Sequence, residues 1–201
     1  MLRLYAITDR KNLDGISLET AVEKALQGGV TCVQLREKNI SFPEYVSTAK
    51  TIREVCSKYD VPLIINDDYR VAIASGADGV HVGAEDMAVA DIRSHVGENF
   101  IIGATAKTVG QAQKAQSDGA DYLGVGAVFP SPTKQNAIRI TPEILREICS
   151  SVEIPVVAIG GINAENVHLI KDCGQAGIAV VSAIFGQRDI IKSAEILRAK
   201  S

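Results

Sequence analysis

Short apolar segments rich in β-branched residues alternate along the chain with segments in which apolar residues recur at helical spacing. Segments of the first kind are predicted as eight strands: 2–7, 32–35, 62–65, 79–82, 100–103, 122–126, 154–159 and 177–181. Segments of the second kind are predicted as helices: 18–26, 43–58, 69–74, 87–96, 109–117, 142–150, 164–172 and 189–200. The pattern therefore indicates one β/α unit repeated along the whole chain.

The predicted strands are apolar on both faces, which is typical of a parallel sheet covered by helices. Small-residue corners such as 28–31 and 76–79 return the chain from helix to strand, and their glycines can close a helix in the left-handed conformation. Eight such units favour a single (β/α)8 TIM barrel over residues 1–201, with its active site at the carboxyl ends of the strands. An open, doubly wound sheet is the alternative.

Composition narrows the class of protein. Apolar residues make up 46% of the chain and charged residues 22%, values typical of a globular protein, and no apolar run approaches the ~20 residues of a membrane span. The net charge of −3 forms no basic stripe, so a nucleic-acid partner is not expected. The first residues lead into a strand without a signal-peptide pattern, so we expect a cytoplasmic protein with reduced cysteines. The sequence is compatible with a homo-oligomer.

The second predicted strand leads into polar residues that share one face. Gln34, Arg36 and Lys38 alternate with the apolar Val33 and Leu35. If the apolar pair packs on the helices, an amide and two cations point into the barrel mouth. Arginine offers a planar fork and lysine a point charge, which suits a pyrophosphate or another anion. The alternative is that both cations are ordinary surface charges.

Acidic residues follow the third and fourth predicted strands. Asp67 comes after Asn66 at the end of one, and Asp86 lies beyond the end of the next. Carboxylates from adjacent strands beside cations are a usual oxygen site for Mg²⁺ shared with a phosphate. The alternative is helix capping by Asp67 or Asp68, and by Asp86.

Hydroxyl groups and a cation follow the fifth and sixth strands. Thr105 lies beyond the fifth, and the long loop after the sixth contains Ser131, Thr133 and Lys134 close to two prolines. These side chains can bind phosphate, and the length of the loop makes it a candidate lid.

The seventh and eighth strands end in small residues. Gly160 and Gly161 follow the seventh and Ser182 the eighth, and loops in these places often bind phosphate in β/α barrels. A structural role in a tight turn is the alternative for the two glycines. His81, near the end of the fourth strand, lines the site or packs beneath it.

Taken together, these strand ends resemble those of the thiamine-phosphate synthase family over nearly the whole chain. The matching segments are Tyr-Ala-Ile-Thr-Asp (5–9), Gln-Leu-Arg-Glu-Lys (34–38), Ile-Asn-Asp-Asp (65–68), Ala-Asp-Gly-Val-His-Val-Gly-Ala-Glu-Asp (77–86), Gly-Ala-Val-Phe-Pro-Ser-Pro-Thr-Lys (126–134), Ile-Gly-Gly-Ile (159–162) and Val-Ser-Ala-Ile (181–184). Each is weak alone, but their order is specific.

The resemblance implies a transferase. 4-Amino-2-methyl-5-hydroxymethylpyrimidine pyrophosphate would join 4-methyl-5-hydroxyethylthiazole phosphate, giving thiamine phosphate and pyrophosphate. The implied chemistry is dissociative: pyrophosphate leaves, a pyrimidinylmethyl cation forms, and the thiazole nitrogen captures it. Such a step needs charge neutralisation on the leaving group rather than a protein nucleophile.

The resemblance also implies roles for individual residues. Asp67 and Asp86 would hold Mg²⁺, and Gln34 would lie along the pyrimidine substrate. The pyrophosphate would be bound by Arg36, Lys38, Asn66, Thr105 and Lys134, of which Arg36, Lys38, Thr105 and Lys134 would be catalytic. The thiazole phosphate would be bound by Ser131, Thr133, Gly161, Val181 through its backbone, and Ser182.

The chain departs from the family pattern in a few places. Thr105 stands where serine is common, and Ala127 and Ser131 stand where proline and threonine are frequent. Residues 135–141 lack the glycine usually found before the sixth helix, which bears on the geometry of the loop rather than on the reaction.

Two other functions are alternatives. A thiazole tautomerase-like isomerase resembles this barrel but tends to lack the metal aspartates and the lysine at Lys38, and relies on a histidine near the position of Lys107. The presence of Asp67, Asp86 and Lys38, with lysine at 107, favours the synthase. A non-catalytic module that binds a phosphorylated ligand would be favoured by loss of a carboxylate or a cation, and none is lost.

Overall fold

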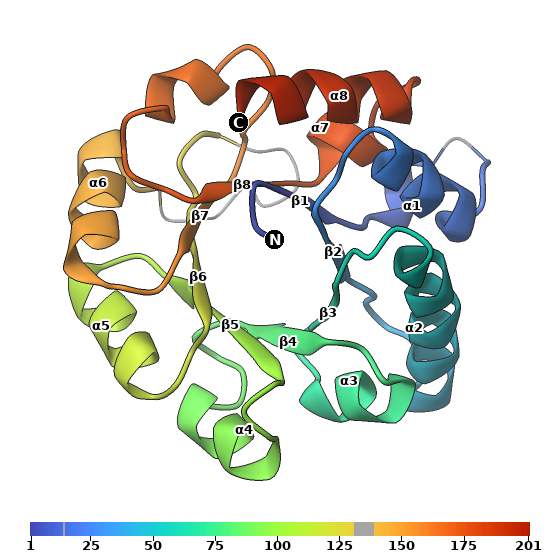
Figure 1. The fold of residues 1–201 in the computed structure, drawn as a ribbon, viewed down its shortest axis with the longest axis horizontal. Helices are drawn as coiled ribbons and strands as arrows, with labels where there is room; N and C mark the ends of the chain where they lie inside the picture. Colours follow the sequence, from blue (N-terminus) through green and yellow to red (C-terminus); the bar gives the residue numbers. More distant parts are fainter. Residues whose placement is uncertain (14, 131–138) are drawn as a thin grey trace.

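The computed structural model describes residues 1–13, 15–130 and 139–201, and eight parallel strands in it form a closed barrel in sequence order (Figure 1). The strands are β1 (Leu4–Ile7), β2 (Cys32–Leu35), β3 (Leu63–Asn66), β4 (Gly79–Val82), β5 (Ile101–Ala106), β6 (Tyr122–Gly126), β7 (Val156–Ile159) and β8 (Gly177–Val180). β1 pairs with both β2 and β8, which closes the ring. The predicted TIM barrel is confirmed, and the open sheet is excluded.

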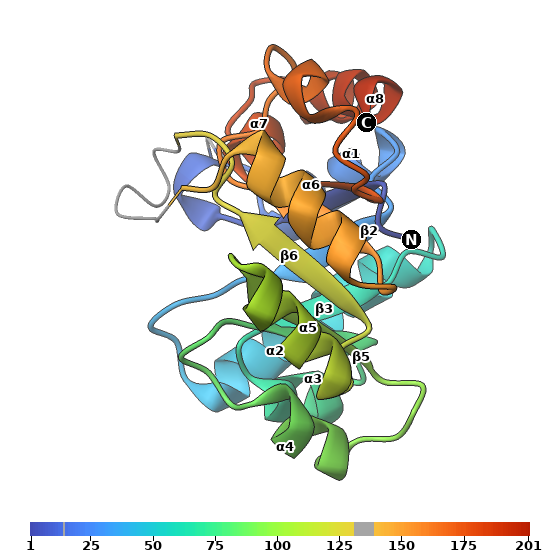
Figure 2. The same cartoon turned by 90° about the vertical axis from the view of Figure 1, so that its left-hand side faces the viewer.

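Helices surround the strands on the outside of the barrel (Figure 1). They are α1 (Leu18–Gln27), α2 (Phe42–Ser57), α3 (Tyr69–Ser75), α4 (Val89–His95), α5 (Val109–Ser117), α6 (Pro142–Ser151), α7 (Ser182–Phe185) and α8 (Ile190–Lys200), with 3₁₀ turns η1 (Arg10–Asn12) and η2 (Val167–Ile170). Figure 2 shows β6 from the side, with α5 and α6 packed along it. Among the described residues, no helix combines the length and the apolar character needed to cross a membrane.

Helix starts at the mouth of the barrel are fixed by local side chains. The helix N-caps that accept a hydrogen bond from a backbone N–H in the first turn are Ser17, Ser41, Asp68, Thr108, Thr141 and Asp189. At α2, Ser41 and Glu44 form a reciprocal capping box. Each cap satisfies an N–H that the helix itself leaves unpaired. The loops that line the mouth therefore end at positions set by the sequence.

The helix predicted over 164–172 is wrong, because only η2 is helical in that segment. The side-chain oxygen of Asn163 accepts hydrogen bonds from the backbone N–H groups of Glu165 and Asn166, at 2.8 and 3.1 Å. The side-chain oxygen of Asn166 in turn accepts from the Asn163 N–H at 2.9 Å. Such local bonds compete with the regular helical pattern, so the segment forms tight turns instead.

Other boundaries also differ from the prediction. β5 continues to Ala106 instead of ending at 103, because its last residues pair with β6 in register Thr105↔Gly124 and Ala106↔Val125. The helix predicted from 87 begins at Val89, and neither η1 nor α7 is anticipated by the sequence pattern. The longer β5 matters for function because it includes Thr105 in the barrel wall.

Two layers of apolar side chains hold the fold together. The larger layer lies between strands and helices, and the smaller fills the barrel interior around Tyr5 and Tyr122. Two glycines on neighbouring strands give these interior side chains room. A Cβ at Gly103 on β5 would overlap the ring and hydroxyl of Tyr122, and one at Gly124 on β6 would meet Cε1 of His81 at 2.9 Å.

Replacing Gly103 with alanine is expected to destabilise the protein by about 1–3 kcal/mol, the usual cost of overpacking a filled core. The measurement is urea-induced unfolding, where the midpoint should fall while the slope stays unchanged. Gly110 in α5 is the matched control, because nothing lies within 4 Å of a Cβ built there. Gly110→Ala should be neutral or stabilising. A Gly103→Ala protein as stable as the parent would contradict this account of the interior.

Candidate active site

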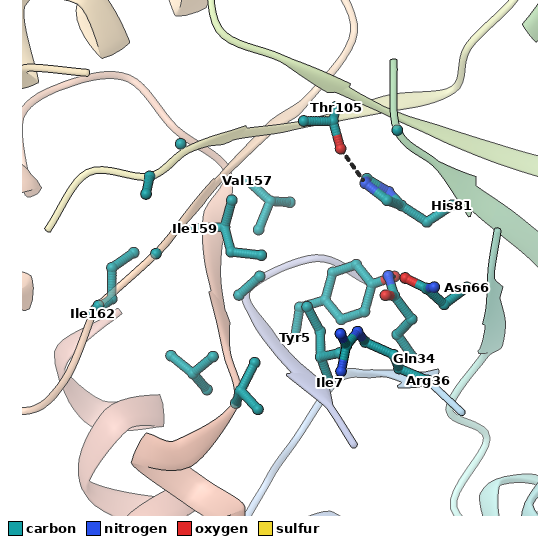
Figure 3. Close-up of a pocket in the computed structure, with 18 of the residues that line it drawn as sticks. Tyr5, Ile7, Gln34, Arg36, Asn66, His81, Thr105, Val157, Ile159 and Ile162 are labelled. Carbon is teal, nitrogen blue, oxygen red and sulfur yellow. Dashed lines mark hydrogen bonds between the residues drawn. The ribbon is translucent and has the colours of Figure 1, made fainter. Parts of the chain in front are cut away.

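A cavity of about 900 Å³ opens at the carboxyl ends of the strands, and all eight strands or the loops that follow them contribute to its lining. Every predicted site residue that the structure describes lines this cavity: Gln34, Arg36, Lys38, Asn66, Asp67, Asp86, Thr105, Gly161, Val181 and Ser182. Figure 3 shows several of them converging. The other three predicted residues, Ser131, Thr133 and Lys134, lie outside the described residues.

The strand β2 divides its side chains between two faces, as its alternation predicts. Val33 and Leu35 pack in the layer between strands and helices, while Gln34, Arg36 and Lys38 line the cavity. The Arg36 backbone N–H donates to the side chain of the buried Thr8 at 2.9 Å, which fixes the end of the strand. The guanidinium and ammonium groups therefore both belong to one concave site.

Asp67 and Asp68 point to different surroundings because the chain turns sharply between them. Asp67 has a φ of +67°, in the left-handed region that aspartate tolerates better than most residues. Its N–H donates to the carbonyl of His81 at 2.9 Å, and its carboxylate accepts from Nζ of Lys38 at 2.8 Å. Asp68 instead caps α3 and pairs with Arg70. The capping alternative thus holds for Asp68, whereas Asp67 lines the cavity.

Asp86 reaches the same region from the loop after β4. Its Oδ2 accepts from the Gly83 N–H at 2.7 Å, and α4 begins only at Val89 without a side-chain cap. Helix capping is therefore not the role of Asp86. Burial raises the pKa of Asp86 above its usual value, the Gly83 N–H opposes the rise, and the Asp67 carboxyl adds to it because like charges repel.

These two carboxyl groups fit a divalent cation that is only partly held by protein. Asp67 lies close enough to Asp86 to raise the pKa of the Asp86 carboxyl, a repulsion that a cation between the two groups would relieve. The described part of the chain has no cluster of three or more His, Cys, Asp or Glu side chains suited to a metal. Mg²⁺ is commonly held by one or two carboxylates, with water and substrate phosphates completing its shell. The donor set matches that type of site.

The opposite wall of the cavity is apolar. Val157, Ile159, Ile162 and Val181 line it, and Figure 3 shows Val157, Ile159 and Ile162 across from the polar group around Gln34. A cavity with charged groups on one side and aliphatic groups on the other suits a ligand that combines a flat heterocycle with phosphate.

Beneath the polar side, a chain of side chains crosses the barrel interior. The Gln34 amide nitrogen donates to the Tyr5 hydroxyl at 2.7 Å, and the Tyr5 and Tyr122 hydroxyls share a bond of 2.9 Å. His81 contacts the Tyr122 hydroxyl through Nδ1 at 3.0 Å and Thr105 Oγ1 through Nε2 at 3.1 Å. Burial lowers the pKa of His81 to about 4, against the opposing effect of Asp67. Burial raises the pKa of both tyrosines.

Sequence reasoning missed most of this interior chain. The alternation of His81 with Val80 and Val82 signalled an inward-facing histidine, but Tyr5 and Tyr122 look like ordinary core residues in the sequence. Lys107, two residues after Thr105, and Gln187, beyond α7, also line the cavity without having been predicted to do so. Lys107 directly follows β5, two residues after Thr105, and this spacing was the available signal for the lysine.

Gly160 and Gly161 have a structural role as well as a place at the cavity. Both have positive φ, +101° and +65°, and a Cβ on either would overlap the chain after β6. The Gly160 carbonyl accepts from the Phe129 N–H at 2.9 Å, and the Gly161 carbonyl accepts from the Asn166 side chain at 2.9 Å. The structural alternative for these glycines is therefore correct, and both also line the cavity.

A closed barrel with a cavity of paired cations, paired carboxylates and an apolar wall at the carboxyl ends of its strands is typical of a β/α-barrel enzyme. Residues 4–184 match the family described as thiamine monophosphate synthase. This chain belongs to that family.

Similar proteins agree with this assignment. Thiamine-phosphate synthase of Clostridium tetani is 48% identical over 96% of this chain and 93% of its own. Thiamine-phosphate synthase of Ruminiclostridium cellulolyticum is 50% identical over 96% of this chain and 92% of its own. The structure of thiamine phosphate pyrophosphorylase from Pyrococcus furiosus is 42% identical and superposes with a TM-score of 0.91, covering 99% of this chain and 95% of that one.

Proposed function

We propose that this chain is a transferase that makes thiamine phosphate from a pyrimidine pyrophosphate and a thiazole phosphate. The bond between the pyrimidine methylene carbon and the pyrophosphate oxygen breaks, and pyrophosphate leaves with the electron pair. The lone pair of the thiazole nitrogen then forms the new C–N bond. The observation that supports this most is the cavity itself, which combines Arg36, Lys38, Asp67 and Asp86 with an apolar wall.

Pyrophosphate departure is the step that the polar side of the cavity would assist. Arg36 offers a fork of N–H donors and Lys38 a mobile charge, so negative charge developing on the leaving oxygen is neutralised as the bond breaks. Asn66 and Thr105 line the same side and would donate further hydrogen bonds. Lys134, from the loop after β6, would add a third cation there.

Asp67 and Asp86 would hold Mg²⁺ at this end of the site. A bound Mg²⁺ supplies Lewis-acid charge neutralisation on the pyrophosphate oxygens. Lys38 contacts the Asp67 carboxylate directly, so the same lysine can orient that carboxylate and reach a substrate oxygen.

The remaining lining would receive the two rings. Gln34 would bind the pyrimidine, and the aliphatic wall would exclude water, so that the pyrimidinylmethyl cation is captured by the thiazole nitrogen. The thiazole phosphate would be bound at the ends of β7 and β8 by Gly161, the backbone N–H of Val181 and Ser182. Ser131 and Thr133 would complete its binding site.

The direct test mixes the purified protein with both substrates and Mg²⁺ and measures thiamine phosphate by the fluorescence of its oxidised form. We expect product only when both substrates are present, loss of product with EDTA, and recovery when Mg²⁺ is added in excess. Absence of product while thiazole phosphate still binds would contradict the proposal and favour an isomerase or a binding module. Undiminished product with EDTA would contradict the metal site alone.

A further inference from the structure

The hydrogen-bond chain beneath the cavity is continuous from one lining residue to another. It begins at Gln34, passes through Tyr5, Tyr122 and His81, and ends at Thr105, with four bonds of 2.7–3.1 Å. Figure 3 shows the last link, between His81 and Thr105, and the Tyr5 ring beside Gln34. Gln34, Tyr5, His81 and Thr105 all line the cavity, while Tyr122 is fully buried beneath them.

The barrel interior is shaped to hold this chain in place. Gly103 and Gly124 leave the space that Tyr122 and His81 occupy, since a Cβ at either position would overlap them. Tyr5 and Tyr122 pack with their ring centroids 5.9 Å apart, and His81 and Tyr122 at 5.4 Å. The hydroxyls and ring nitrogens therefore have little freedom to seek other partners.

Counting donors and acceptors fixes the direction in which the hydrogen bonds of this chain of side chains point. The Gln34 NH₂ group can only donate, so the Tyr5 oxygen accepts from it. Within the described part of the chain, the Tyr122 oxygen is then the one nitrogen or oxygen acceptor that the Tyr5 proton can reach. The Tyr122 proton passes to Nδ1 of His81, and Nε2–H donates to Thr105. In the reverse direction the Tyr5 proton would be left with the sulfur of Cys32, which contacts the Tyr5 hydroxyl but is a weak acceptor, so that direction is less favourable.

We infer that Tyr5, Tyr122 and His81 form a one-way hydrogen-bond relay that makes Thr105 a hydrogen-bond donor toward an anion in the cavity. Because Thr105 Oγ1 accepts from His81, its own proton remains available for a ligand oxygen. Tyr122 and His81 are thus positioning residues, which act through Thr105. The direction of the relay depends on the fold alone, and its use on a pyrophosphate oxygen rests on the proposed function.

The direction can be tested without substrate by nitrogen NMR of the histidine rings. The chain has three histidines, and the exposed His95 and His168 can be assigned by His95→Gln and His168→Gln variants. The relay requires that His81 carries its proton on Nε2, with Nδ1 bare. A proton on Nδ1 with Nε2 bare would overturn the relay, whether or not the protein is a synthase.

The action through Thr105 is tested by a double-mutant cycle on kcat. Tyr122→Phe is expected to lower kcat about tenfold in the parent, since a buried acceptor then loses its donor. The same change should have little effect in a Thr105→Val background, where the hydroxyl is already gone. Thr105→Ser, which keeps the hydroxyl, should restore the sensitivity to Tyr122→Phe.

An equal fall in both backgrounds would show that Tyr122 supports only the core, and would overturn the action through Thr105. Tyr59→Phe is the control for loss of a tyrosine hydroxyl, because Tyr59 lies outside the cavity lining and its hydroxyl contacts Gln27, at 3.4 Å. It should leave kcat unchanged in both backgrounds. A protein with no synthase activity would refute the proposed function, and the NMR experiment would still decide the relay.

Discussion

Replacing Asp67 with asparagine is expected to lower kcat at least about a thousandfold while the barrel stays folded, since metal-assisted charge stabilisation contributes several kcal/mol to such reactions. The substitution removes one of the two carboxylates that would hold Mg²⁺ and the partner of Lys38. Asparagine suits this position because it also tolerates the φ of +67°. Alanine would lose the charge as well, but it would add backbone strain.

Asp68→Asn is the matched control for this prediction. Asp68 caps α3, and asparagine is an equally good N-cap, so the helix should be unaffected. The exposed pair with Arg70 would be lost, and surface pairs contribute little to stability. The measurement is kcat across a Mg²⁺ titration, with thermal unfolding of each variant. Near-normal turnover of Asp67→Asn at low Mg²⁺ would refute the metal assignment.

Arg36→Lys is expected to lower kcat about a hundredfold to a thousandfold, although it keeps the positive charge. Lysine cannot reproduce the fork of N–H donors that matches two phosphate oxygens at once. If the fork acts mainly on charge that develops as pyrophosphate leaves, kcat should fall far more than KM rises. Steady-state kinetics with the pyrimidine substrate varied will separate the two effects.

Arg70→Lys provides the control, because Arg70 is exposed on α3 and pairs only with Asp68 among the described residues. Its kinetics should match the parent. A rise in KM with unchanged kcat in Arg36→Lys would mean that Arg36 binds the substrate and the transition state equally, and it would remove the catalytic role proposed for the guanidinium.

The repeat of the barrel and the cavity positions of the predicted polar residues could be worked out from the sequence, since both depend on local patterns. Alternation along β2 and the three residues after it placed Gln34, Arg36 and Lys38 on one face, because extended chain has a period of two. The ends of neighbouring parallel strands must meet at one edge of the sheet. That rule is enough to predict that Asp67 and Asp86 lie at the same cavity.

The remainder depends on contacts between distant segments. Tyr122 on β6 has room for its side chain because its neighbour in register on β5 is Gly103. This register depends on both strands and cannot be read from either one alone. The choice between Asp67 and Asp68 is made by a left-handed turn that aspartate permits but does not require. Similarly, η2 replaces a helix because of particular bonds made by Asn163.

The pairing of β1 with both β2 and β8 has a consequence for how the protein folds during its synthesis. As the chain is synthesised, β1 finds β2 early but must wait for the last strand before Leu4 can pair with Ile178. Until then β1 and β7 are open edges that can pair wrongly. Val181 and Ser182 follow β8, so an unfinished chain has no complete binding cavity. Substrate binding can therefore stabilise only the closed barrel, and the nascent chain has to close the barrel without that stabilisation.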